Sequence, residues 1–447
     1  MTAKVVVIGK DARTAQIVRR LRASGARVYV IADVDNPIFL HESEKFYRGR
    51  TDDVSVILSI AGDIRPDLVV IGPEEPLYAG VVDRIQGELG TPCFGPPKAL
   101  ARIEWSKSFA RSLLSKHEIP GNLEYKVFTS TNGMEAYLRY LGNFVVKADG
   151  LMGGKGVKVS GDQLASTEEA LRFASHILRD GPVVIEERVE GEEFSLQSFS
   201  DGDSLLDAIP VQDHKRAFEG DRGPNTGGMG SYSCADQGLP FLDSSQLLAA
   251  SKINAAVTRA LREETGIPYR GVLYGGFMAT ADGVRVLEFN ARLGDPESMN
   301  VLAVLDGDFL ALCQNTANGS LKDSNIRFRK KATVCKYLVP EGYPDNPVRG
   351  ARIRGVLESS DDVEVVFAAI RESDDGSLNL TGSRSVAFVG VAETVGQAGE
   401  LVEEAIRKVE GPVFHRRDIG TEALLAKRVE HMHQLRAAPA SSRRKIG

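Results

Sequence analysis

A glycine-rich segment at residues 147–157 has the residue types and spacing of a phosphate-binding loop. It reads Lys-Ala-Asp-Gly-Leu-Met-Gly-Gly-Lys-Gly-Val, with Lys147 at its start and Lys155 near its end. Because glycine has no side chain, backbone N–H groups can approach phosphate oxygens closely, and the lysines add positive charge. The segment lacks the GxxxxGK[ST] pattern of a Walker A loop. Its composition predicts phosphate binding, and the alternative is an ordinary glycine hairpin turn.

A group of glutamates follows the apolar run at residues 183–185. The group includes Glu186, Glu187 and Glu193. A charged run usually forms a solvated surface. These carboxylates, however, stand where a buried strand is expected to emerge, which is a suitable place to hold an adenine amine and ribose hydroxyls.

Two polar segments, 212–216 and 224–230, have the composition of a binding loop. Asp213 together with Lys215 and Arg216 could bind a zwitterion, since a carboxylate suits an amine and the two cations suit a carboxylate. Long glycine-rich loops in compact domains are often functional lids. The alternative is a mobile surface loop.

The segment Leu287–Arg292 (Leu-Glu-Phe-Asn-Ala-Arg) has the spacing of a metal site on a strand. In a regular strand, Glu288 and Asn290 point to one face, whereas Leu287 and Phe289 point to the other. Two such oxygen ligands suit Mg²⁺, which keeps waters and shares nucleotide phosphates. Arg292 is placed to bind a carboxylate or an acyl phosphate. The alternative is a half-exposed edge strand with ordinary polar residues.

Composition argues against several classes of protein. The net charge is −6 and the 55 lysines and arginines are spread along the chain, which disfavours a broad surface for nucleic acid or anionic membrane. No stretch approaches the roughly 18 apolar residues of a membrane span, and no signal-peptide core is present. The four cysteines are scattered, as is typical of reduced thiols. We therefore expect a cytoplasmic protein without nucleic-acid or membrane partners.

The histidines and the last basic segment give weaker signals. The seven histidines show no metal-ligand spacing. The segment His415–Asp418 (His-Arg-Arg-Asp) could bind phosphate, and the alternative is an exposed basic corner.

Alternating strands and helices in the first hundred residues would position one edge of the site. Strands separated by helices predict right-handed crossovers and a doubly wound parallel sheet. Ligands of such sheets lie beyond the carboxyl ends of the strands, where this chain has Gly9, Arg13 and Glu74. The apolar runs predict strands at 4–9, 27–33, 67–72 and 92–94, and helices at 11–24 and 81–89, followed by a helix that carries Trp105, Phe109 and Leu113.

The whole chain is expected to be an α/β protein of three domains. The segments are an N-terminal α/β domain (1–122), a β-rich central domain (123–326), a C-terminal domain (327–436) and a flexible tail (437–447). The tail consists mainly of small, polar and basic residues, a composition that is typical of disordered termini. Strands are expected at 143–149, 157–160, 183–187, 194–200, 271–280, 284–290, 333–339, 363–371 and 385–389, and helices at 167–179, 244–265 and 393–409.

Taken together, these segments resemble the glycinamide ribonucleotide synthetase family, ATP-grasp enzymes of purine biosynthesis. The resemblance runs in order along almost the whole chain, and its 212–233 stretch is highly specific. It implies a doubly wound N-terminal domain, a central ATP-grasp domain and a small α+β C-terminal domain, in a monomer or weak homodimer. The matching stretches are GPEEPL (72–77), FGPPKALARIEWSKSFARSLL (94–114), VVKADGLMGGKGV (145–157), QDHKRAFEGDRGPNTGGMGSYS (212–233), GVLYGGFM (271–278), VLEFNARLGDPE (286–297), VPEGYP (339–344) and RRDIG (416–420).

The resemblance also implies a role for each motif. Glycine's carboxylate would attack ATP to give glycyl phosphate, which the amine of phosphoribosylamine would capture, with Arg292 and Lys147 acting in catalysis. Glu288 and Asn290 would bind Mg²⁺ or Mn²⁺. The residues implied for ATP are Lys107, Lys147, Gly153, Gly154, Lys155, Gly156, Glu186, Glu187 and Glu193. Those implied for glycine and phosphoribosylamine are Gly9, Arg13, Glu74, Asp213, Lys215, Arg216, Arg292 and Asp295.

The first loop departs from the family pattern. The family reads close to GxGGREHA, whereas residues 9–16 here read Gly-Lys-Asp-Ala-Arg-Thr-Ala-Gln, so that only Gly9 and Arg13 fit. Asp11 puts a negative charge near the expected phosphate. Two alternatives therefore stay open. One is an ATP-grasp ligase that joins glycine or a similar amino acid to a different amine. The other is a nucleotide-binding regulatory protein without turnover.

Overall fold

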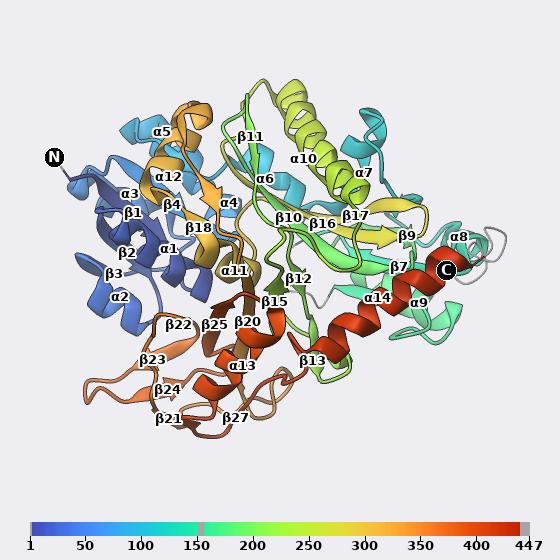
Figure 1. The fold of residues 1–447 in the computed structure, drawn as a ribbon. Helices are drawn as coiled ribbons and strands as arrows, with labels where there is room; N and C mark the ends of the chain where they lie inside the picture. The colour runs from blue at the N-terminus through green and yellow to red at the C-terminus, as the bar shows by residue number, and fades with distance from the viewer. Residues whose placement is uncertain (1, 151–155, 439–447) are drawn as a thin grey trace.

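The computed structural model describes residues 2–150 and 156–438 of the chain. Figure 1 shows an N-terminal, a central and a C-terminal part that adjoin one another, with the last helix extending from the C-terminal part across the central one. Gly153, Gly154 and Lys155 of the predicted phosphate loop lie outside the described residues. None of the helices in the described ranges combines the length and the apolar character that a membrane crossing requires.

The N-terminal part is a five-stranded parallel sheet with helices on both faces. Its elements are β1 (Lys4–Ile8), α1 (Ala12–Ala23), β2 (Arg27–Ala32), α2 (Pro37–Glu42), β3 (Lys45–Arg48), α3 (Val54–Ile64), β4 (Leu68–Ile71), α4 (Glu75–Ala79), α5 (Val81–Leu89) and β5 (Cys93–Phe94). The strand order is β3-β2-β1-β4-β5. Alternate residues of β1 enter two separate apolar clusters, one on each face, as a sheet covered on both sides requires. The predicted doubly wound sheet is confirmed.

Two short helices, α6 (Lys98–Trp105) and α7 (Lys107–Lys116), connect this sheet to the central part. The single helix predicted around Trp105 and Phe109 is broken at Ser106. The Ser106 hydroxyl caps α7 by accepting the Phe109 N–H at 3.3 Å, a role that serine fulfils well. The break places Lys107 in the first turn of α7.

The central part contains two antiparallel sheets. The first has the order β6-β9-β7-β8, and helices α8 and α9 pack on it through one apolar cluster. The second has the order β11-β10-β16-β17 and packs against α10. The elements are β6 (Tyr125–Phe128), α8 (Met134–Leu141), β7 (Phe144–Ala148), β8 (Val157–Val159), α9 (Thr167–Ile177), β9 (Val183–Glu187), β10 (Glu192–Ser200), β11 (Leu205–Asp207), α10 (Ser244–Thr265), β16 (Gly271–Thr280) and β17 (Gly283–Asn290).

Strand β17 contains a β-bulge that the sequence did not predict. Gly276 of β16 pairs with Glu288, but the next residue, Phe277, pairs with Val286. Leu287 is therefore the extra residue of the bulge, where two residues of one strand oppose one of its neighbour. The regular alternation expected for this segment is wrong at Leu287.

The C-terminal part is built around a sheet in the order β12-β15-β20-β25-β22, with β27 also paired to β20. Its first two strands come from the central segment, so residues on both sides of position 326 share one sheet. Helices α11 and α13 pack against it. The elements are β12 (Gln212–Asp213), β15 (Gly230–Ser233), α11 (Glu297–Val304), β20 (Ala332–Pro340), β22 (Val363–Phe367), β25 (Val386–Ala392), α13 (Val395–Ile406) and β27 (Val413–Phe414).

Smaller elements complete the molecule. The hairpin of β13 (Arg216–Phe218) and β14 (Arg222–Asn225) follows β12, and the final helix α14 (Glu422–Ala437) lies across the central part (Figure 1). The remaining elements are β18 (Leu305–Asp306), α12 (Phe309–Asn318), a short 3₁₀ turn (Leu321–Asp323), β19 (Arg327–Phe328), β21 (Arg352–Gly355), β23 (Ile370–Glu372), β24 (Leu378–Leu380) and β26 (Val409–Glu410).

Candidate active site

Glu186, near the end of β9, is the centre of a buried ion triad. Arg111 of α7 donates to its two oxygens at 2.7 and 3.0 Å, and Lys147 Nζ of β7 lies 2.6 Å from the same carboxylate. The Glu186 side chain is 1% exposed. Burial disfavours its charged form, but the two cations outweigh this effect and lower the pKa of Glu186 to about 2. The triad therefore fixes the position of Lys147.

The bulge in β17 gives the same cations a further acceptor. Lys147 Nζ and Arg111 Nη2 each donate to the Leu287 carbonyl oxygen at 3.2 Å. The next residue, Glu288, has a side chain that is 47% exposed. The bulge thus joins the end of β17 to the triad.

Lys107 approaches the start of the glycine-rich loop from α7. Its Nζ donates to the Gly150 carbonyl at 3.0 Å. Burial lowers the pKa of Lys107, and the charge of Lys147 lowers it further. Asp149 accepts the Ser108 N–H at 3.2 Å, which holds the first turn of α7 against the loop. The two lysines are therefore brought together from a helix and a strand that lie 40 residues apart in the chain.

Lys215 bridges two carboxylates at the open end of the central sheets. Its Nζ lies 3.1 Å from Glu193 Oε2 and 3.8 Å from Glu288 Oε1. Glu193 raises the pKa of Lys215 against the opposing effect of burial. Burial likewise opposes ionisation of Glu288, but Lys215, Lys147 and Lys107 together lower its pKa. Glu288 is thus a charged, solvent-accessible carboxylate surrounded by lysines.

Arg292 connects the end of β17 to the edge of the N-terminal sheet. Its Nη2 lies 2.9 Å from Glu104 Oε1 and its Nε lies 3.4 Å from Glu74 Oε2. Glu104 also accepts the Ala291 N–H at 2.8 Å, and Arg13 lies 3.9 Å from Glu74. Burial raises the pKa of Glu104 to about 7, although Arg292 opposes the shift. The predicted rim residues Arg13 and Glu74 therefore meet Arg292.

Asp11 is the ion-pair partner of the Arg13 guanidinium in the first loop, residues 9–16. The two side chains form an ion pair, and Arg13 Nη1 also donates to the Leu293 carbonyl at 2.6 Å. Asp11 caps α1 by accepting the Thr14 N–H at 2.9 Å. A Cβ atom on Gly9 would lie 2.2 Å from Thr14 Oγ1, so the close approach of Thr14 requires glycine there.

Gly228 lies against Asp213 and against Pro296, the residue that follows Asp295. A Cβ atom on Gly228 would lie 2.6 Å from Asp213 Oδ1 and 2.5 Å from Pro296 Cδ, next to Asp295. Arg384 Nη1 links Gly228 to Asp295: it donates to the Gly228 carbonyl at 3.1 Å and lies 3.2 Å from the Asp295 carboxylate. Burial, with the nearby charge of Glu297, raises the pKa of Asp213 well above its usual value.

Three predicted residues take other partners. Arg216 forms an ion pair with Asp162 and donates to the Gly223 carbonyl at 2.8 Å, so it does not join Lys215 at Glu193. Glu187 accepts the Glu124 N–H at 3.0 Å. The Gly156 carbonyl accepts the Ala148 N–H at 2.8 Å.

Sequence reasoning missed Arg111, Glu104 and Arg384. A signal for Arg111 was available, because it follows Lys107 by four residues and thus shares a helix face with it. Glu104 lies inside the matching stretch 94–114, three residues before Lys107, but no local pattern relates it to its partner Arg292. Arg384 reaches the site from a segment that carries none of the motifs.

The three parts of the chain match three parts of one protein family. Residues 3–104, 105–298 and 333–422 match the phosphoribosylglycinamide synthetase N domain, ATP-grasp (A) domain and C domain, respectively. A phosphoribosylamine–glycine ligase of Methanocaldococcus jannaschii is 45% identical over 445 residues, covering 97% of this chain and 100% of the relative. The protein of the same name from Methanosarcina barkeri is 43% identical over 435 residues, covering 97% and 100%.

Solved structures give a consistent result for the fold. The crystal structure of phosphoribosylamine–glycine ligase from Thermotoga maritima superposes with a TM-score of 0.77 at 28% identity, covering 93% of this chain and 99% of that one. The biotin carboxylase domain of Hydrogenobacter thermophilus 2-oxoglutarate carboxylase, a complex with MgADP, gives a TM-score of 0.72 at 14% identity, with coverage of 99% and 95%. The second likeness shows the fold alone.

Proposed function

The chain belongs to the phosphoribosylglycinamide synthetase family, and we propose that it joins glycine to 5-phosphoribosylamine, giving glycinamide ribonucleotide, ADP and phosphate. The predicted family and the predicted α/β fold with a central ATP-grasp domain are confirmed. The chain is an ATP-grasp ligase that acts on small molecules. The observation that carries the proposal is the half-exposed carboxylate of Glu288, which lies 3.8 Å from Lys215 and whose pKa is lowered against burial by Lys215, Lys147, Lys107 and Arg292.

ATP would lie between the two sheets of the central part. Lys107 and Lys147 would contact its phosphates, as would Gly153, Gly154, Lys155 and Gly156 of the glycine-rich loop. We place adenine and ribose near Glu186 and Glu187, at the end of β9, and near Glu193, at the start of β10. Because its carboxylate is held by Arg111 and Lys147, Glu186 acts in this scheme by orienting Lys147.

The oxygen donors at the end of β17 suit a magnesium or manganese ion. Glu288 is charged and half exposed, and Asn290 follows it by two residues. Among residues 2–150 and 156–438, no group of three or more His, Cys, Asp or Glu side chains could hold a metal by itself. This fits an ion that completes its shell with water and nucleotide phosphate. Such an ion, held by Glu288 and Asn290, would neutralise charge on the phosphates.

Glycine would be bound as a zwitterion between the acidic and the basic residues. Asp213 and Asp295 would face its ammonium group, and Lys215 and Arg292 its carboxylate. A carboxylate oxygen attacks the γ-phosphorus and ADP leaves, which forms glycyl phosphate. The acceptor nitrogen then attacks the carbonyl carbon, inorganic phosphate leaves, and the nitrogen loses a proton. Arg292, held by Glu104, would stabilise the charge that develops on the acyl phosphate.

Phosphoribosylamine would bind at the rim formed by Gly9, Arg13 and Glu74. The pairing of Arg13 with Asp11 favours one alternative, a ligase that joins glycine or a similar amino acid to another amine. We further propose domains at 1–122, 123–326 and 327–436, and a cytoplasmic protein that is a monomer or weak homodimer. Of the tail predicted at 437–447, residues 439–447 lie outside the described residues.

The test is ADP release from Mg·ATP and glycine, with and without phosphoribosylamine formed from ribose 5-phosphate and ammonia. The proposal expects release that depends on both substrates, with glycinamide ribonucleotide detected by mass. Glycine-dependent release that is indifferent to the acceptor would support the alternative amine. ATP binding without any turnover would support a regulatory protein.

A further inference from the structure

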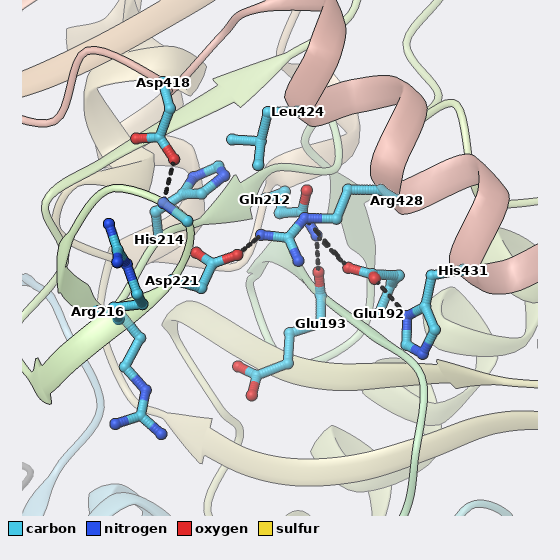
Figure 2. A network of polar contacts seen from close by, with 12 residues as sticks. Glu192, Glu193, Gln212, His214, Arg216, Asp221, Asp418, Leu424, Arg428 and His431 are labelled. Carbon is cyan, nitrogen blue, oxygen red and sulfur yellow. Dashed lines mark hydrogen bonds and ion pairs between the residues drawn. The ribbon is translucent and has the colours of Figure 1, made fainter.

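The C-terminal helix α14 reaches the central part through Arg428. Its Nε lies 3.4 Å from Glu192 Oε2, and its Nη2 forms an ion pair with Asp221. His431, one turn later, contacts Glu192 Oε1 through Nδ1 at 2.6 Å. Figure 2 shows Arg428 between the two carboxylates. One side chain of α14 therefore joins the start of β10 to the β13–β14 hairpin.

These two carboxylates lie on the chain segments that carry Glu193 and Lys215, two residues of the proposed active site. Glu192 directly precedes Glu193, and its Oε2 accepts from Gln212 Nε2 at 3.2 Å. Asp221 lies in the turn between β13 and β14, and β13 begins directly after Lys215. Arg428 thus connects the two chain segments that carry the Lys215–Glu193 ion pair.

The segment His415–Asp418, for which the sequence suggested phosphate binding or an exposed basic corner, strengthens the same connection. Arg416 is 1% exposed and donates to the Arg216 carbonyl at 3.1 Å and to Asp221 Oδ1 at 3.0 Å. Asp418 accepts the Gly220 N–H at 2.9 Å. The C-terminal part therefore holds the hairpin from two sides, at Asp221 and along the backbone that follows Lys215.

We infer that Arg428 is a positioning residue for nucleotide binding: it holds β10 and the β13–β14 hairpin at the spacing at which Lys215 contacts both Glu193 and Glu288. The inference rests on the proposed function, because that function assigns Glu193 to the nucleotide and Glu288 to its metal ion. Lys215, which bridges these two carboxylates, is assigned there to glycine. Arg428 acts through Glu192 and Asp221. Since α14 comes from the C-terminal part, Arg428 gives that part an influence on ATP affinity, beside the hairpin contacts of Arg416 and Asp418.

The variant Arg428→Gln in the full-length chain tests the inference. Without the guanidinium, Glu192 keeps Gln212 and His431 as partners, and Asp221 keeps Arg416. Neither the buried Glu192 nor the partly exposed Asp221 is left without a partner, so the fold is expected to persist. The measurements are the Kd of Mg·ATP by calorimetry and the KM values of the three substrates.

The expected result is an increase of about tenfold in both the Kd and the KM of ATP, a coupling of ordinary size for a residue outside the site. The KM of phosphoribosylamine should change less than about twofold, because Arg13 and Glu74 belong to a separate cluster. Arg428→Lys should restore part of the ATP affinity, because an ammonium group can pair with one of the two carboxylates.

Arg436→Gln is the matched control on the same helix. Arg436 donates to the Phe241 carbonyl at 3.0 Å and to Gln246 Oε1 at 2.9 Å, so it also ties α14 to the central part. A purely structural role of α14 predicts the same result for both variants, a smaller active fraction with unchanged KM values. That result, or an unchanged Kd in Arg428→Gln, would overturn the inference.

The experiment distinguishes a failure of the proposed function from a failure of this inference, and it also covers a variant that does not fold. If the wild-type protein shows no ligase turnover, the proposed function fails, whereas the Kd of Mg·ATP still decides the role of Arg428. If Arg428→Gln does not fold, Asp221→Asn weakens the ion pairs of the hairpin with both Arg428 and Arg416 and keeps the Arg428–Glu192 pair. A weaker ATP affinity is then expected, and an unchanged Kd overturns the inference.

Discussion

Lys147 and Glu186 form a 2.6 Å ion pair across two neighbouring strands. In the antiparallel register of β7 and β9, Val145 is opposite Glu186 and Lys147 is opposite Val184. The two charged residues are therefore diagonal neighbours on one face of the sheet. Arg111 joins them from α7. A strand pairing and a helix contact together determine where the Lys147 ammonium lies.

Glu186→Gln is expected to destabilise the fold and weaken ATP binding together. The amide would leave two buried cations without a counter-charge, and breaking a buried ion pair of this kind costs about 3–5 kcal/mol. Urea unfolding at pH 7 measures the loss. The control is Glu187→Gln, because Glu187 accepts only a backbone N–H among the contacts described above. Equal stability of the two variants would contradict the role of the triad.

The contribution of Glu186 should also depend on pH in one direction. Its folded pKa of about 2 lies below the ordinary value of 4.5. Its stabilising effect is therefore present above pH 4.5 and is lost as the pH falls through 2. The stability difference between wild type and Glu186→Gln should shrink as the pH is lowered from 5 to 3. A difference that widens on acidification would show that the assigned direction is wrong.

The elements of the N-terminal sheet could be predicted because each buried strand is a short apolar run with turn residues at its ends. β1 and β2 begin at the predicted residues, Lys4 and Arg27. β3 was missed because it is a half-exposed edge strand with charged residues at both ends. Helix α11 was missed for the opposite reason: all eight of its residues are buried, so it has no amphipathic period.

The sequence predicted those parts of the candidate site in which one local motif carries the chemistry. It did not predict contacts between residues that are far apart in the chain. Lys147 and Glu288 belong to recognisable motifs. Their exact surroundings depend on Arg111 and on the bulge at Leu287, which strand periodicity cannot reveal because the extra residue is defined only by the pairing with β16. The neighbours Lys215 and Arg216 were predicted as one cationic pair, but their side chains take different partners.

Glu288→Ala is expected to abolish Mg²⁺-dependent turnover, with a loss of at least about a hundredfold. The fold should persist, because the Glu288 side chain is 47% exposed. Steady-state ADP release and circular dichroism check the two statements. Arg285→Ala, on the same strand, is the control and should keep its activity. Activity close to wild type in Glu288→Ala would exclude this carboxylate as a metal ligand.

Asp11→Asn is expected to lower the KM of phosphoribosylamine by about fivefold, because it frees the Arg13 guanidinium for the substrate phosphate. Asparagine can still cap α1, so stability should change little. Asp53→Asn is the control, since Asp53 caps α3 by accepting the Val56 N–H at 3.1 Å. Restoring glycine at positions 11 and 12 should act in the same direction. An unchanged KM would place the phosphate elsewhere.

Glu104→Gln is expected to remove a pH-dependent part of the stability while keeping the acceptor for the Ala291 N–H. The folded pKa of Glu104, about 7, lies above its ordinary value of 4.5, mainly because the side chain is buried. Folding therefore favours the protonated form, a contribution that is complete below pH 4.5 and is lost as the pH rises through 7. Wild type should lose stability relative to Glu104→Gln between pH 5 and 8, by at most about 3 kcal/mol. Thermal unfolding across this range measures the difference, with the exposed Glu88→Gln as a control without such a trend. If wild type instead gained stability over the variant as the pH rose, the ion pair with Arg292 would dominate over burial, and Glu104 would be charged throughout.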